Sequence, residues 1–158
     1  MPKRGSRSSR AWALMLASSE TGSPRQWAVS VAGEEGIVAA RQQAREVARD
    51  LGFGLVDQSR IATAVSELTR NVVRYATGGQ GNVLIRELEL PGKGIGIEVI
   101  VRDDGPGIAN VEQALRDGFT TGTGLGMGLS GTRRLMDEMA IDSAPGRGTT
   151  VSIRKWRR

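Results

Sequence analysis

The sequence has 158 residues, which is enough for one domain with a hydrophobic core of its own. It contains no cysteine and no histidine, which excludes disulfides, thiolate catalysis, cysteine-based metal sites and a histidine general base or phosphohistidine. The net charge is +5, but residues 1–27 and 154–158 carry +4 each and the rest of the chain carries −3. The basic residues therefore lie at the two ends, and no nucleic-acid-binding face is predicted on the core.

Residues 1–26 are rich in serine and arginine and show no apolar periodicity. Their apolar run, 11–17, only faintly resembles a secretory signal, because it is at the lower limit of length for one. We interpret 1–26 as a disordered basic tail, or as upstream residues added by an early start codon, and place the domain at 27–158. No stretch of the chain is long and apolar enough to span a bilayer, so no membrane association is expected.

Hydrophobic periodicity divides the rest of the chain into helices and hairpins. The predicted elements are, in chain order, strand 26–31, helices 34–51 and 57–76, strands 82–90 and 95–102, helices 111–116 and 125–139, and strands 140–144 and 149–156. The helices contain apolar residues every three or four positions, and Gly52 and Gly78 end the first two. Asp57 is the expected N-cap of the second helix. The turns 91–94 and 145–148 contain proline and glycine and predict β-hairpins.

These elements do not form regular strand–helix–strand units. The predicted fold class is therefore α/β in the form of an α+β two-layer sandwich. We expect a mixed, mostly antiparallel sheet with the helices on one face. The sequence contains no internal repeats.

Glu67 and Asn71 are four residues apart on the second predicted helix, and therefore on one face of it, beside the apolar stripe. An asparagine oxygen suits Mg²⁺, which keeps most of its waters and takes only one or two protein ligands. A carboxylate beside it can position or deprotonate an attacking hydroxyl. Arg74, about one turn further along, can reach a polyphosphate. For an isolated pair of this kind, a solvated polar face is the more common structure.

Asp103 follows the apolar strand residues 95–101 and precedes Gly105 and Gly107. A buried carboxylate at this point can accept a hydrogen bond from an exocyclic amine, which would select adenine over guanine. The two glycines allow the backbone to approach a flat base. Taken alone, the segment is equally typical of an acidic β-turn at the end of a strand.

Glycines recur between Gly122 and Gly131, where the helix 125–139 is expected to begin. Residues 126–131 formally match the G-x-G-x-x-G dinucleotide fingerprint, but that motif follows a strand and here a threonine-rich loop precedes it. The P-loop lysine and the H-R-D and D-F-G signatures of eukaryotic-type kinases are absent. Backbone amides and a helix N-terminus favour phosphates, so we interpret the segment as a flexible lid over a nucleotide. The alternative is a glycine-rich linker.

Together, the three segments resemble the N, G1 and G2 boxes of the GHKL, or Bergerat-fold, ATPases. Within that superfamily the chain is similar to the small bacterial anti-sigma and switch-protein serine kinases, and most of all to RsbT-type stressosome kinases. The segments that carry this similarity are 40–42, 51–54, 57–61, 64–68, 117–119, 134–138 and 155–156. The resemblance extends from about residue 27 to the end of the chain.

The resemblance implies ATP and Mg²⁺ as cofactors and assigns a role to each matching residue. Glu67 is the implied general base, Asn71 the Mg²⁺ ligand, Asp103 the adenine anchor, and Thr149 the threonine that reaches adenine through water. The remaining implied nucleotide contacts are Arg74, Gly105, Gly107, Ile108, Gly122, Gly124, Leu125, Gly126, Met127, Gly128 and Leu129.

Two features depart from the family pattern. The lid between Gly118 and Gly124 is short and contains no lysine or arginine, so a cationic contact to the γ-phosphate must come from Arg74 or elsewhere. The basic N-terminal extension also has no counterpart in the family.

The resemblance further implies a cytoplasmic serine/threonine-protein kinase of a bacterial stress response that works by partner switching. Its substrate would be a serine on a STAS-domain antagonist protein, and the released kinase would bind and activate a PP2C-type phosphatase. One alternative is an RsbW-type kinase that binds a sigma factor directly, and another is a nucleotide-dependent binding module without catalysis. Glu67 favours turnover, because binding alone needs no base. The oligomeric state stays open.

Overall fold

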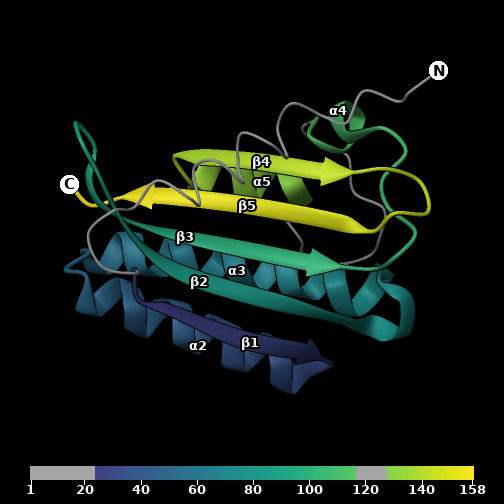
Figure 1. Ribbon diagram of the computed structural model, residues 1–158, viewed down its shortest axis with the longest axis horizontal. Coiled ribbons are helices and arrows are strands. Elements are labelled where there is room, and N and C mark those ends of the chain that lie inside the picture. The colour runs from purple at the N-terminus through teal and green to yellow at the C-terminus, as the bar shows by residue number, and fades with distance from the viewer. Residues whose placement is uncertain (1–23, 117–127) are drawn as a thin grey trace.

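The computed structural model describes residues 24–116 and 128–158, in which helices cover one face of a five-stranded β-sheet (Figure 1). The elements are β1 (Gln26–Ala32), α2 (Glu34–Asp50), α3 (Leu55–Tyr75), the 3₁₀ turn η1 (Thr77–Gly79), β2 (Gln80–Leu90), β3 (Gly94–Asp103), α4 (Val111–Ala114), α5 (Gly128–Leu135), β4 (Glu138–Ser143) and β5 (Thr149–Trp156). β1 begins one residue before the predicted domain boundary, and the division of the chain at residue 27 stays a prediction. The tail residues 1–23 and the lid residues 117–127 lie outside the described residues.

The strand order is β1-β2-β3-β5-β4, and each neighbouring pair is antiparallel. The predicted two-layer fold, with a mostly antiparallel sheet and the helices on one face, is confirmed. The sheet was also expected to be mixed, but every strand pair within the described residues is antiparallel. β3 and β4 do run in the same direction, because both are antiparallel to β5. However, β5 lies between them, so no parallel pair forms.

The core lies between the sheet and the helices. Val83 and Ile85 of β2 and Ile97, Val99 and Val101 of β3 alternate with residues on the other face, and each is at most 3% exposed. They pack in one hydrophobic cluster with apolar residues of α2 and α3. The period-two pattern of the strands and the three-to-four-residue pattern of the helices therefore meet in one core, as predicted. No helix in the described part of the chain has the length and apolarity needed to cross a membrane.

The start of α3 differs from the prediction. Gly54, not Asp57, is the N-cap residue. The Asp57 carboxylate lies in the first turn instead, 2.9 Å from Arg60 Nη1 and 3.8 Å from Lys155 Nζ. It is therefore engaged with side chains rather than with the first backbone N–H groups of the helix.

The end of α5 is a second correction. The helix was expected to continue to Met139, but it ends at Leu135, and Met139 lies in β4. Asp137 explains the change, because its backbone N–H donates to the Arg154 carbonyl at 2.9 Å and its Oδ2 accepts from Trp156 N–H at 2.8 Å. These bonds to β5 begin the strand and override the helical periodicity. The other elements begin and end within about two residues of their predicted bounds.

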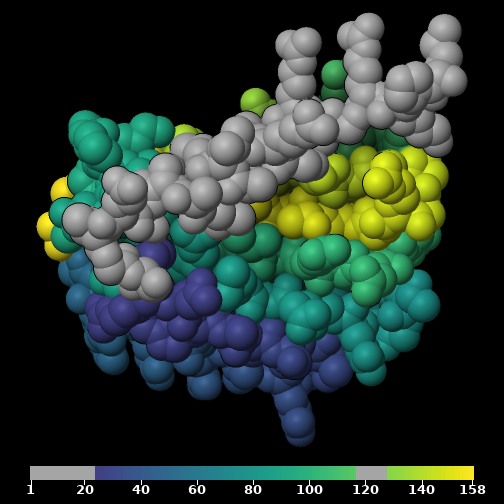
Figure 2. Space-filling view, viewed as in Figure 1, coloured from purple at the N-terminus to yellow at the C-terminus, as the bar shows by residue number. Residues whose placement is uncertain are grey.

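Figure 2 is viewed from the side of the sheet opposite the helices. This face of the sheet holds a buried ion cluster on the three central strands. The strand register places Arg86 of β2, Glu98 of β3 and Arg154 of β5 side by side. Arg154 Nε donates to Glu98 Oε2 at 2.5 Å, and Arg86 Nη1 lies 3.5 Å from Glu98 Oε1. The Glu98 side chain is 0% exposed. A carboxylate can be buried in this way because cations flank it on both neighbouring strands.

Glu138 joins the β2–β3 turn to the end of β5. Its carboxylate accepts hydrogen bonds from Lys93 Nζ and from Trp156 Nε1, both at 2.9 Å, and Lys93 lies 5.3 Å from the centroid of the Trp156 ring. Burial by itself would raise the pKa of Glu138, but the hydrogen bonds from Lys93 and Trp156 outweigh it, so the pKa lies below its ordinary value of 4.5.

Replacing Glu138 with glutamine tests the pH dependence of this contact. A carboxyl group whose pKa is lowered by folding stabilises the folded state fully above its unfolded pKa, and this contribution is lost as the pH falls through the folded pKa. We therefore expect Glu138→Gln to lower the free energy of unfolding at pH 7 and at pH 5 by similar amounts, and the difference to shrink below about pH 4.5. Denaturant unfolding at several pH values measures it. Glu89→Gln is the control, on the β2–β3 hairpin that carries Lys93. The same pH dependence of the free energy of unfolding in both variants would contradict a stabilising role of the Glu138 contact.

Candidate functional site

The two candidate residues of α3 lie in its C-terminal half. Glu67 is buried, with 8% of its surface exposed, and Asn71 is half-buried. Arg74 is exposed in the last turn of the helix. The helix therefore places the carboxylate deepest and the arginine outermost, on one stripe of its surface. That these side chains border a nucleotide site stays a prediction.

The sequence did not single out the ion partner of Glu67. Arg70 Nη1 lies 2.7 Å from Glu67 Oε1, and the hydrogen bond between them is partly buried. The spacing of three residues on a helix could have indicated this contact.

Asp103 is the last residue of β3, as predicted, and it is half-buried. Its Oδ1 accepts a hydrogen bond from the Gly105 N–H at 2.8 Å. A carboxylate has two oxygen atoms and about four acceptor positions, so it can accept a further hydrogen bond from a ligand amine. The bond to Gly105 fixes the orientation of the side chain at the end of the strand.

The turn that follows Asp103 is held between the end of α3 and the β4–β5 hairpin. A Cβ on Gly105 would lie 2.8 Å from Ala76 Cα, so the turn packs directly on the residue after α3. Gly107 has φ of +77°, and a Cβ there would lie 2.0 Å from the Ala144 carbonyl oxygen. Only glycine satisfies both conditions at residue 107. The turn after Asp103 is thus packed against the C-terminal end of α3.

Thr149 lies beside Asp103, because the two residues are paired in the β3–β5 register. Ser143 completes this group, although the sequence did not single it out. Its hydroxyl donates to the Gly148 carbonyl at 3.0 Å, accepts from Ile108 N–H at 2.8 Å, and lies 2.8 Å from Thr149 Oγ1. The predicted hairpin could have indicated it, since a short turn brings the end of the first strand close to Thr149.

Among the lid and G2 candidates, the structure describes Gly128 and Leu129, the first residues of α5. Leu129 is buried in the hydrophobic core, with 9% of its surface exposed. Helix α5 packs against α3, the helix that carries Glu67. The candidates Gly122, Gly124, Leu125, Gly126 and Met127 lie outside the described residues.

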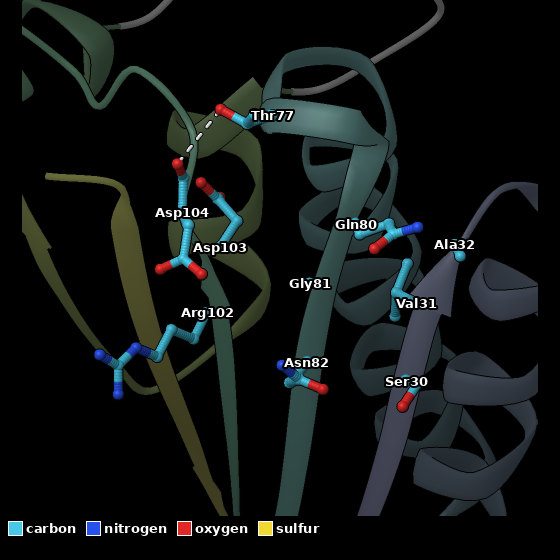
Figure 3. A pocket seen from close by; sticks show the side chains of 10 residues that line it. All are labelled: Ser30, Val31, Ala32, Thr77, Gln80, Gly81, Asn82, Arg102, Asp103 and Asp104. Atoms are coloured by element: carbon cyan, nitrogen blue, oxygen red, sulfur yellow. Dashed lines mark hydrogen bonds between the residues drawn. The ribbon is translucent and has the colours of Figure 1, made fainter. Parts of the chain in front are cut away.

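A hollow of about 550 Å³ opens at the ends of β1, β2 and β3 (Figure 3). Polar side chains from Ser30, Asn82, Asp103 and Asp104 line it, and Thr77 Oγ1 donates to the Asp104 carbonyl at 3.2 Å. Asp103 is the only candidate residue in its lining. The hollow therefore adjoins Asp103 at the ends of these strands, and its lining does not include Glu67, Asn71 or Arg74.

Residues 56–158 match the family described as histidine kinase-, DNA gyrase B- and HSP90-like ATPase. The chain is 48% identical over 133 residues to the serine/threonine-protein kinase RsbT of Bacillus subtilis (strain 168). That alignment covers 84% of this chain and 98% of RsbT.

Two further similarities concern a second relative and a solved structure. The chain is 41% identical over 100 residues to an anti-sigma F factor of Caldanaerobacter subterraneus subsp. tengcongensis, covering 61% of this chain and 68% of that protein. The solved structure of the RsbU and RsbW domains of a Mycobacterium tuberculosis protein has a TM-score of 0.57 at 24% identity, and covers 85% of this chain and 33% of that longer one. The latter shows the shared fold. The chain therefore belongs to the histidine kinase-, DNA gyrase B- and HSP90-like ATPase family, and within it is an RsbT-type serine/threonine-protein kinase.

Proposed function

We propose that this kinase transfers the γ-phosphate of ATP to a serine of a STAS-domain antagonist protein in the cytoplasm. Released from that partner, it binds and activates a PP2C-type phosphatase, as part of partner switching in a stressosome pathway. The observation that carries the proposal is the 48% identity to RsbT over 98% of that kinase. The pairing of Asp103 with Thr149, and the packing of the Gly105 turn on the end of the helix that carries Glu67 and Asn71, support it.

In this mechanism each side chain has one task. Asp103 accepts a hydrogen bond from the adenine amine, and Thr149 contacts the base through water. Glu67 accepts the proton of the substrate serine as its oxygen attacks the γ-phosphorus. Phosphoryl transfer depends mainly on positioning and on neutralising charge, so a rigid helix that carries Glu67 and Asn71 suits it.

The residues present also fit Mg²⁺. Within residues 24–116 and 128–158, no group of three or more acidic side chains could hold a metal ion. Mg²⁺ bound to a nucleotide does not need such a group, because phosphates and waters supply most of its ligands. The amide oxygen of Asn71 is a hard donor on the half-buried face of α3 and provides one protein ligand. Bound there, the ion would neutralise charge on the phosphates.

The test of the function is transfer of radiolabelled γ-phosphate to recombinant STAS-domain proteins from the same organism. We expect one of them to be phosphorylated on serine, and the phosphorylated form to release the kinase. No transfer to any of them would contradict the proposal. A phosphatase assay with and without the kinase tests the second partner in the same way.

A second candidate function is direct binding of a sigma factor, in the manner of an anti-sigma factor kinase. The 41% identity to an anti-sigma F factor favours it. Co-purification with sigma factors and with the PP2C-type phosphatase separates the two functions. Tight, ATP-dependent binding of a sigma factor without activation of a phosphatase would favour the second candidate.

Replacing Asp103 with asparagine tests the adenine contact. Asparagine keeps an oxygen that can accept from Gly105 N–H but presents an NH₂ group toward the adenine amine. Losing a hydrogen bond to a charged group removes about 1.5–3 kcal/mol, so ATP affinity should fall roughly tenfold or more. Calorimetry with ATP and GTP measures the loss and the selectivity. The control is Asp104→Asn, on the exposed neighbour, and equal ATP affinity in the wild type and Asp103→Asn would disprove the contact.

A further inference from the structure

Arg70 and Glu67 form an ion pair within the proposed catalytic site. Arg70 Nη1 donates to Glu67 Oε1 at 2.7 Å, and the two residues are one helical turn apart on α3. The Glu67 side chain is 11% exposed and that of Arg70 is 34% exposed. Only one of the two carboxylate oxygens is used in this contact. The contact therefore holds the Glu67 carboxylate by its Oε1 atom.

A second ion pair on the same helix provides a comparison. Asp57 and Arg60 have the same spacing of three residues and lie 2.9 Å apart, but their side chains are 21% and 50% exposed. That pair is in the first turn of α3, far from the site, where exposed ion pairs contribute little. The Arg70–Glu67 pair is more buried, and charge-assisted hydrogen bonds are stronger and shorter where water is excluded.

We propose that Arg70 is a positioning residue that fixes the Glu67 carboxylate for phosphoryl transfer. This inference rests on the proposed function. By holding Oε1, Arg70 leaves Oε2 to accept the proton of the substrate serine. In that step the serine oxygen forms a bond to the γ-phosphorus, the bond from the γ-phosphorus to the β–γ bridging oxygen breaks, and ADP leaves. Glu67 then releases the proton to water.

The geometry favours this role over a direct contact to the γ-phosphate. The guanidinium is already engaged with a buried carboxylate, whereas Arg74 is exposed in the last turn of α3. An arginine that acts through Glu67 must lose its effect when Glu67 cannot act as a base. An arginine that binds the phosphate must keep its effect. This difference can be measured.

The experiment is a double-mutant cycle with Arg70→Met, Glu67→Gln and both together, and with Arg60→Met as the matched control. The rate of γ-phosphate transfer is measured at saturating ATP, and ATP affinity is measured by titration. Loss of a charge-assisted hydrogen bond predicts that Arg70→Met lowers the rate roughly tenfold or more, with ATP affinity nearly unchanged. In the Glu67→Gln background the same substitution should change the rate less than about twofold. Arg70→Lys keeps the charge and should recover part of the rate.

Three outcomes would overturn the inference. If the two substitutions lower the transfer rate independently in the double variant, Arg70 contacts the γ-phosphate directly instead of acting through Glu67. A large loss of ATP affinity in Arg70→Met would lead to the same conclusion. A wild-type rate in Arg70→Met would remove its role altogether. If Arg70→Met unfolds more easily than Arg60→Met, the cycle is repeated with Arg70→Gln and Arg70→Lys. If the wild type phosphorylates no STAS protein, the proposed function fails, and the same cycle on basal ATP hydrolysis still measures the coupling of Arg70 to Glu67.

Discussion

Replacing Glu67 with glutamine is expected to lower phosphoryl transfer roughly 10²–10⁴-fold, which is typical of losing a general acid–base group. ATP affinity should stay nearly unchanged, because glutamine is isosteric, forms helices well and leaves Asn71 in place. Its amide oxygen can also still accept the hydrogen bond from Arg70. Radiolabelled γ-phosphate transfer to a recombinant STAS-domain partner measures the rate, and a binding titration with ATP and Mg²⁺ measures the affinity.

Asn71→Ala is the matched comparison on the same face of the helix. It removes the proposed Mg²⁺ ligand, so magnesium-dependent nucleotide binding should be lost together with turnover. The two variants thus separate binding from chemistry. Full activity of Glu67→Gln would remove its role as a base. A modest loss would be less decisive, because the loose transition state of phosphoryl transfer needs the base only late in the reaction.

Among the substitutions proposed for this protein, replacing Glu98 with glutamine is expected to lower the free energy of unfolding most, by about 3–5 kcal/mol. The substitution keeps the volume of the side chain but removes the negative charge that Arg154 and Arg86 both face in the interior of the sheet. Two buried guanidinium groups then lack their shared counter-ion. Denaturant unfolding at neutral pH measures the free energy, and the slope with denaturant should be unchanged if the folded state stays intact.

Glu87→Gln is the control for this prediction. Glu87 lies on the neighbouring strand and also pairs with an arginine, since Arg25 Nε lies 2.7 Å from Glu87 Oε2. That pair is at the surface, where the Arg25 side chain is 63% exposed, so its loss should change the free energy of unfolding by about 0–1 kcal/mol. Equal effects of the two substitutions would show that burial of Glu98 does not determine its contribution.

Much of the candidate site could be predicted because the signal in each segment comes from residues that are close together in the sequence. The four-residue spacing of Glu67 and Asn71 places them on one face of any helix, and α3 confirms the helix. Asp103 was expected at the end of a strand and is there. Ser143 was missed because its role comes from pairing with Thr149 across a hairpin turn, and a lone serine in a strand carries no signal of its own.

The sequence by itself determined the helices, the two hairpins and the apolar faces, because side-chain periodicity reports local geometry and burial. Only the tertiary structure decided which strands are neighbours. The insertion of β5 between β3 and β4 made the sheet antiparallel, and it also brought Thr149 to Asp103 and Arg154 to Glu98. Bonds to β5 likewise ended α5 earlier than its periodicity indicated. The physical reason is that backbone pairing between distant segments depends on the whole fold, whereas periodicity extends over only a few turns or residues.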